Sequence, residues 1–157
     1  MMRRMPDLPP CGIYRTTVPL PDHIPAGRLV FFHNHGDPGT GIYLPSSWAA
    51  NRARWHDHGH PIPSPAWAAS LAPLAAEGFY RVREPFTCCE KRCRLYEADL
   101  LVQLGYDASA QPLLFVPEWT DVALAISEMG LRIDEDRLVR LAPLKVVETP
   151  RETQKLH

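Results

Sequence analysis

The sequence predicts a mainly β or α+β fold: a small curled antiparallel sheet or barrel with one or two short helices. Seventeen prolines interrupt the 157 residues. Proline cannot donate a hydrogen bond to a central β ladder and breaks a helix interior, so many of these sites must be turns or strand edges. Between the prolines lie short runs of β-branched and aromatic residues bounded by turn-forming residues, which is typical of strands.

Length and composition are those of one ordinary domain. A chain of 157 residues with 45% hydrophobic residues is long enough for a single core. We expect a flexible leader over residues 1–10, a single globular domain over 11–148 and a frayed tail over 149–157.

Charge and hydropathy limit the partners and the compartment. The net charge of −1 provides no broad basic surface, which argues against nucleic acid and a membrane surface as partners. No apolar segment resembles a signal peptide or a membrane helix, so we expect a soluble, cytoplasmic protein. In that reducing compartment the four cysteines are expected to be free thiols.

Nine segments have the composition of strands. Two pairs of them are expected to form hairpins, 100–106 with 113–116 and 122–126 with 131–133. One helix across 121–129 is the alternative to the second hairpin, because short apolar runs are ambiguous. The expected strands cover 12–20, 29–35, 41–44, 78–83, 100–106, 113–116, 122–126, 131–133 and 144–147.

The strongest helix is expected over residues 47–58. Ser46 or Ser47 can cap its first turn, and Gly59 followed by Pro61 provides a stop. Shorter helical segments are expected near 66–71 and over 134–141, where acids come first and arginines last. The residues with helical spacing in the main helix are Trp48, Asn51, Arg52 and Trp55.

The stretch 29–45 joins the most apolar expected strand to this helix and carries the first candidate site. With a period of two, His33 and His35 project to the same side of the strand, where both imidazoles can reach one metal ion. The alternative is that they form hydrogen bonds with turn groups such as Asp37.

His33-Asn34-His35 followed by Gly-Asp-Pro resembles the zinc-binding segment of JAMM-type metalloproteases over about ten residues. That resemblance implies a downstream S-x-x-D acid and an upstream glutamate. Here the third residue after Ser46 or Ser47 is alanine, and the first glutamate of the chain is Glu77. The resemblance therefore does not extend to the rest of the catalytic site, and we assign no family.

A second histidine group, at residues 56–60, falls at the expected end of the main helix. Histidines are favoured there by the negative end of the helix dipole, which accounts for them without a ligand. The alternative is that His58 or His60 swings toward His33 and His35 to complete a metal site.

The densest group of soft ligands is Cys88, Cys89 and Cys93. Three thiols within six residues can bind one zinc ion if Cys11 or a histidine supplies the fourth ligand. A second interpretation is a redox pair, Cys89 with Cys93, in which neighbouring Lys91, Arg92 and Arg94 lower the thiol pKa. The third is that these cysteines are inert packing residues.

The aromatic residues are expected mostly in the core, but Trp67 and Trp119 lie in proline-rich segments and could line a partner surface. We therefore expect a small β-rich binding or interaction module for a protein or small-molecule partner, with zinc as an optional stabilising ion. The alternatives are a metal-dependent hydrolase-like enzyme using His33 and His35, and a thiol redox sensor. The candidate metal ligands are Cys88, Cys89, Cys93, Cys11, His33 and His35.

Overall fold

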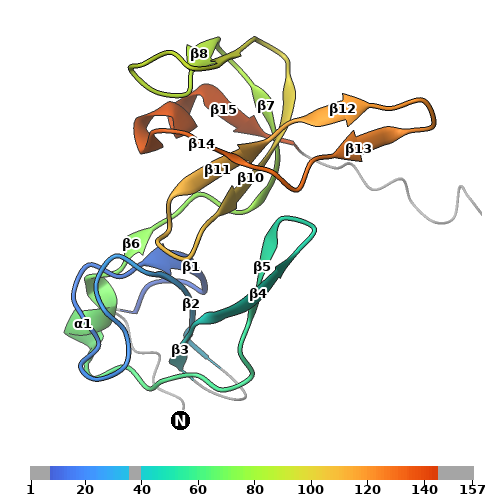
Figure 1. Cartoon of the computed structure of the whole chain (residues 1–157). Coiled ribbons are helices and arrows are strands. Elements are labelled where there is room, and N and C mark those ends of the chain that lie inside the picture. Colours follow the sequence, from blue (N-terminus) through green and yellow to red (C-terminus); the bar gives the residue numbers. More distant parts are fainter. Residues whose placement is uncertain (1–7, 36–39, 145–157) are drawn as a thin grey trace, which may run out of the picture.

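The computed structural model describes residues 8–35 and 40–144 and confirms the expected fold class. All strand pairs in this part of the chain are antiparallel, and they form several small sheets, none of which closes into a barrel (Figure 1). No helix in the same part is long and apolar enough to cross a bilayer.

The N-terminal sheet has the strand order β3-β2-β1-β6. Its central pair is in register from Gly12 opposite Phe32 to Arg15 opposite Leu29. A short helix, α1, precedes β6 and is capped by Ser64, whose hydroxyl accepts from the amide of Trp67. The elements are β1 (Gly12–Arg15), β2 (Leu29–His33), β3 (Gly41–Tyr43), α1 (Pro65–Ala69) and β6 (Ala72–Pro73).

The C-terminal sheet has the order β14-β11-β10-β7-β15, so the predicted hairpin 100–106 with 113–116 is confirmed as β10 and β11. The last described strand, β15, covers Leu141–Pro143. Of the expected final strand over 144–147, Leu144 is not in a strand and residues 145–147 lie outside the described residues. The elements are β7 (Gly78–Val82), β10 (Leu101–Tyr106), β11 (Pro112–Phe115), β14 (Leu131–Arg132), the 3-10 helix η1 (Glu135–Arg140) and β15 (Leu141–Pro143).

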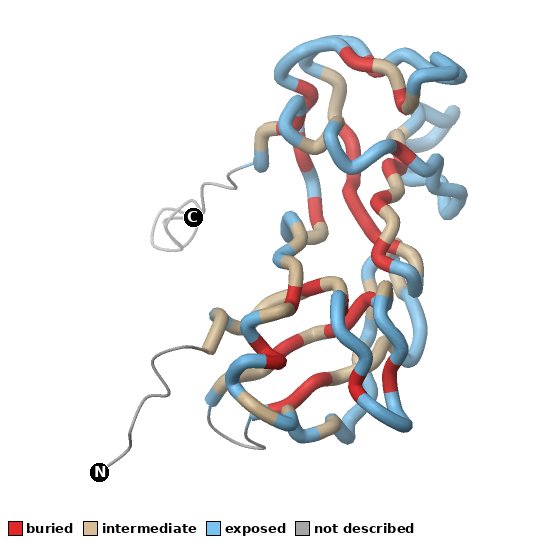
Figure 2. The backbone as a smooth tube through the Cα atoms, turned by 90° about the vertical axis from the view of Figure 1, so that its left-hand side faces the viewer, coloured by how far each residue is buried: buried red, intermediate tan, exposed pale blue. Residues whose placement is uncertain are grey.

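Two hydrophobic clusters fill the interior, one beside each sheet. Figure 2 shows buried stretches of backbone in both parts of the molecule. Strand β2 contributes to both clusters because its side chains alternate between two faces. Leu29 packs in the cluster of the C-terminal sheet, whereas Val30 and Phe32 pack in that of the N-terminal sheet. The continuous apolar character of β2 is thus explained by burial on both faces.

The predicted helix over 47–58 is wrong, because this segment forms the hairpin of β4 (Pro45–Ala49) and β5 (Arg52–Trp55). Ala50 and Asn51 have φ values of 50° and 65°, which are those of the two central residues of a type I′ turn. Burial alternates along Arg52–Trp55 with a period of two, as expected for a strand. The helical spacing of Trp48 and Trp55 was therefore coincidental.

Tertiary contacts select this hairpin over a helix. The buried side chain of Gln103 on β10 donates to the carbonyl of Ala50 at 2.9 Å and accepts from the side-chain amide of Asn51 at 3.0 Å. Gly105 on the same strand leaves room for the turn, since a Cβ there would lie 2.7 Å from the Asn51 carbonyl oxygen. The turn is therefore held by a residue 52 positions away.

The second predicted hairpin is also corrected. Residues 131–132 form β14 and pair with β11, whereas β13 (Leu124–Ile126) pairs with β12 (Pro117–Trp119). The alternative helix across 121–129 does not form. A further small hairpin joins β8 (Phe86–Thr87) to β9 (Leu95–Tyr96) and carries the three-cysteine segment.

Candidate metal centres

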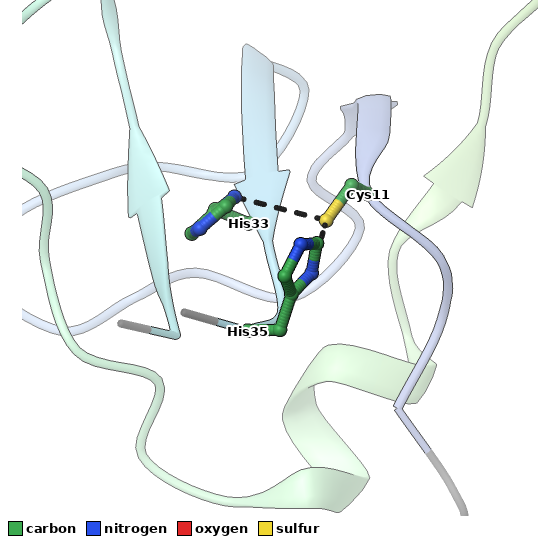
Figure 3. Close-up of side chains that lie close together, drawn as sticks. All are labelled: Cys11, His33 and His35. Carbon is green, nitrogen blue, oxygen red and sulfur yellow. Dashed lines mark hydrogen bonds between the residues drawn. The ribbon is translucent and has the colours of Figure 1, made fainter. Parts of the chain in front are cut away.

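The first cluster consists of Cys11, His33 and His35, at one end of the N-terminal sheet (Figure 3). Because Gly12 pairs with Phe32, the residue before β1 lies beside the residue after Phe32. The strand period then carries His35 to the side of His33, and their ring centroids are 4.8 Å apart. The expectation that the two histidines share one side is confirmed.

The donor atoms of this cluster converge on the sulfur. Cys11 Sγ lies 3.7 Å from His33 Nδ1 and 3.3 Å from His35 Nδ1. The Asn34 amide N–H donates to the same sulfur at 3.3 Å, and its side-chain oxygen lies 3.2 Å from Sγ and 2.7 Å from His35 Nδ1. Two imidazole nitrogens and the side-chain oxygen of Asn34 therefore all lie close to the Cys11 sulfur.

These separations fit a zinc ion. Tetrahedral zinc with a sulfur at about 2.3 Å and a nitrogen at about 2.05 Å places those two atoms about 3.6 Å apart. The two observed sulfur–nitrogen distances, 3.7 and 3.3 Å, lie on either side of that value. The other ring nitrogen of His33, Nε2, is buried and has no hydrogen-bond partner among the described residues. Among the described residues, the polar contact of the His33 ring is thus on the side that faces Cys11.

The second cluster consists of Cys88, Cys89 and Cys93, in the loop between β8 and β9. The amide of Arg92 donates to the Cys89 carbonyl at 3.0 Å, which closes a tight turn. Arg92 takes a left-handed φ of 54° and directs the chain back, so that Cys93 returns to the other two thiols. Cys88 is buried, Cys89 is partly buried and Cys93 is exposed.

The thiols of this loop influence one another. Cys88 Sγ and Cys89 Sγ are 3.6 Å apart. The pKa of the Cys89 thiol is held below its ordinary value, chiefly by a hydrogen bond from Cys88, with backbone hydrogen bonds at Lys91 and Cys93 adding to the effect. The predicted lowering is thus found for Cys89, where its cause is local hydrogen bonding rather than the neighbouring cations. The pKa of Cys93, the other member of the expected redox pair, is instead raised, chiefly by its hydrogen bond with Cys89.

The six candidate ligands divide into these two groups. Within each group, the ligand atoms lie within 4.8 Å of one another. Cys11 joins the histidines, so it is not the fourth ligand that we expected for the thiols. His58 and His60 join neither group of described residues, and no helix ends beside them. His60 instead pairs with Ile42 through the backbone and stacks on His23.

A third feature, an apolar groove of about 530 Å³, was missed by the sequence reasoning. It lies between β7, the hairpin β12–β13 and Leu144, and Arg52 and Glu77 supply its charged groups. Burial raises the pKa of the Glu77 carboxyl, while the Ala53 amide and Arg52 oppose that shift. No periodic pattern indicates this groove, because its lining residues come from separate segments that are spread between Arg52 and Leu144.

The hairpin that forms one wall of the groove is the most exposed apolar segment described. We call residues 117–130, which contain β12, β13 and the residues after them, the arm (Figure 1). Trp119, Val122 and Met129 are 82%, 94% and 85% exposed. Trp119 therefore lies on the surface, where we expected that it could contact a partner, whereas Trp67 is buried in the core.

Comparison of the chain with protein-family models, with curated proteins and with solved structures finds no match, so the site is interpreted from its own geometry.

Proposed function

We propose that this protein is a binding module that recognises a protein partner through the arm and the adjoining groove. The observation that carries the proposal is the exposure of the arm: every residue from 118 to 130 is exposed, and five large apolar side chains are among them. Monomeric proteins rarely leave contiguous apolar surface of this kind in water unless it is used for binding.

The charge of the arm indicates the chemistry of the partner. Residues 117–130 contain Glu118, Asp121 and Glu128 and no lysine, arginine or histidine. A partner segment with apolar side chains flanked by lysine or arginine would fill the apolar surface and complement these carboxylates. Charge complementarity would also raise the association rate and make it dependent on salt.

A randomised peptide library displayed on phage tests this proposal. The wild type should enrich peptides that combine apolar and basic residues, and Trp119→Ser with Val122→Ser should reduce their affinity at least tenfold. Val139→Ser is the matched control, since Val139 is 69% exposed but lies on η1 outside the arm. Equal enrichment on the arm variant would overturn the proposal. Sedimentation that shows a dimer broken by the arm substitutions would replace the partner with a second copy.

We further propose that zinc stabilises this module at Cys11, His33 and His35. The supporting observation is the meeting of two imidazole nitrogens and one thiol at separations that suit tetrahedral zinc, beside the Asn34 oxygen. Imidazole and thiolate together form a donor set that suits zinc. An ion held there would connect the segment before β1 to the end of β2, and so stabilise the folded sheet.

Metal content and thermal unfolding test the zinc proposal. One equivalent of zinc should be found in purified protein or taken up by metal-free protein, and it should raise the unfolding temperature. His35→Ala should abolish both effects, whereas His56→Ala, an exposed histidine outside the cluster, should change neither. Zinc retained in His35→Ala but lost in Cys93→Ser would place the ion at the other cluster and contradict the proposal.

A hydrolase-like function would need a general base beside the ion. No carboxylate of the described residues belongs to the cluster of Cys11, His33 and His35. Asp37, which the sequence analysis named as a turn group near the histidines, lies outside the described residues. The described donors support a stabilising role for zinc, and this is the role that we propose.

A further inference from the structure

The three thiols of the β8–β9 loop form a compact sulfur triangle that the proposed binding function does not use. Cys88 and Cys89 have their sulfurs 3.6 Å apart, and all three sulfurs lie within 4.8 Å of one another. Metal–sulfur bonds of about 2.3 Å place three sulfurs of a trigonal site about 4 Å apart. An ion can therefore enter this triangle with small side-chain rotations and no change in the backbone.

The number of donors distinguishes the ions that suit the triangle. Structural zinc sites almost always have four protein ligands. Among the described residues only the three cysteines belong to this group, so it offers three sulfur donors, whereas the other cluster is a mixed set of one sulfur and two imidazole nitrogens. An all-sulfur site with three ligands suits a soft ion for which three donors suffice, and Cu(I) is the soft ion that thiolates select.

The charge of the loop also suits such an ion. A complex of Cu(I) with three thiolates carries a net charge of −2. Lys91, Arg92 and Arg94 are neighbours of the thiols in the sequence and are opposed by one acid, Glu90, which gives this part of the loop a net charge of +2. Arg94 is positioned by the ring of Tyr96, since its guanidinium carbon lies 5.2 Å from the ring centroid.

We propose that Cys88, Cys89 and Cys93 form a three-coordinate Cu(I) site. Binding forms three copper–sulfur bonds and releases one proton from each thiol to solvent, so that no electron is transferred. Cys88 provides a buried sulfur at the base of the site and Cys93 provides an exposed one at its mouth. The ion therefore enters and leaves on the Cys93 side, through which a soluble thiol carrier of Cu(I) can exchange it.

The test is a competition titration of reduced protein, without oxygen, with Cu(I) and the coloured Cu(I) chelator bathocuproine disulfonate. The wild type should take Cu(I) from the chelator, and Cys93→Ser should weaken that binding at least tenfold. Cys93 is chosen because it is exposed, so its substitution leaves the fold intact. Cys11→Ser is the matched control from the other cluster and should retain the wild-type affinity.

X-ray absorption of the copper-loaded Cys11→Ser protein supplies a readout of the site itself. Three sulfur neighbours per copper are expected, and two remain in a protein that also carries Cys93→Ser. Wild-type affinity in Cys93→Ser, or loss of affinity in Cys11→Ser, would overturn the proposal. It would also fail if zinc displaced Cu(I) from the wild type at equal concentration. None of these results depends on the arm or on a partner.

Discussion

The two candidate metal-binding clusters of this protein are built in opposite ways. Cys11 and His33 are 22 residues apart in the sequence and meet only because β1 pairs with β2. Cys88, Cys89 and Cys93 lie within six residues and meet around one turn. The first cluster therefore depends on the folded sheet, whereas the second can form in a short segment of unfolded chain. An ion stabilises a fold only to the extent that it prefers the folded state.

The largest losses of stability are expected from substitutions in the two hydrophobic cores. The first candidate metal-binding cluster depends on these cores, because it forms only in the folded sheet. Phe32→Ala in the N-terminal core should lower the free energy of unfolding by about 3–5 kcal/mol, and Leu104→Ala in the C-terminal core by about 2–5 kcal/mol. Both side chains are fully buried. Because Leu29 and Val30 connect the two cores through β2, urea unfolding followed by fluorescence and by circular dichroism should show one transition.

That single transition is what the predicted domain over 11–148 requires. Two separate transitions, with Phe32→Ala shifting one and Leu104→Ala the other, would divide the chain into two units. Phe79→Ala is a suitable control, since this side chain is 39% exposed and its loss should cost far less than either core substitution.

The next effect tests the difference between the clusters directly. Zinc at one hundred times its dissociation constant should stabilise the protein by about 2.7 kcal/mol, because unfolding separates Cys11 from the histidines. Cu(I) at the same ratio to its own dissociation constant should stabilise less, because the unfolded loop retains the three thiols within six residues. Urea unfolding with each metal measures both values, and equal stabilisation would contradict the argument.

A smaller effect is expected where the two sheets are connected. Gln103 on β10 holds the tip of the β4–β5 hairpin through Ala50 and Asn51. Gln103→Leu keeps the bulk of the side chain and removes both hydrogen bonds, so it should cost roughly 1–2 kcal/mol. Hydrogen exchange should increase in β4 and β5 but not in β8 and β9. Exchange that increases equally in both hairpins would mean that Gln103 has no specific role.

Much of the fold could be predicted from local pattern, and the errors have a physical cause. The β10–β11 hairpin has two apolar runs joined by a polar loop, and both features are local. The β4–β5 hairpin was missed because Trp48, Asn51, Arg52 and Trp55 have helical spacing, and the hydrogen bonds from Gln103 that hold the turn come from a distant strand. Local pattern likewise placed His33 beside His35, but only the β1–β2 register brings Cys11 to them.

The groove and the arm could not be predicted in the same way. Strand composition is present in residues 124–126, but the partner strand is 117–119, and the sequence also allowed pairing with 131–133. The choice is made by β14, which pairs with β11 and so removes the competing partner. When a third strand decides which two strands pair, the residue spacing within those two strands does not reveal the pairing.

The smallest effect concerns Glu77, which also connects the β4–β5 hairpin to the C-terminal sheet. Its carboxylate accepts from the Ala53 amide at 2.9 Å, and its carbonyl accepts from Arg52 at 3.0 Å. Burial raises the pKa of Glu77 in the folded protein, so the folded state holds the proton more tightly than the unfolded chain does. This contribution to stability is complete below the ordinary carboxyl pKa of 4.5 and is lost as the pH rises through the raised value.

Glu77→Gln keeps an oxygen for the Ala53 amide and has no proton to lose. The stability of the wild type relative to this variant should therefore fall as the pH rises above 4.5, by less than about 1 kcal/mol in all. Urea unfolding at a series of pH values measures the difference, with Glu97→Gln, an exposed glutamate outside the groove, as the control. A difference that grows with pH would mean that Arg52 and the Ala53 amide outweigh burial, and the groove would then present a carboxylate stabilised in its charged form.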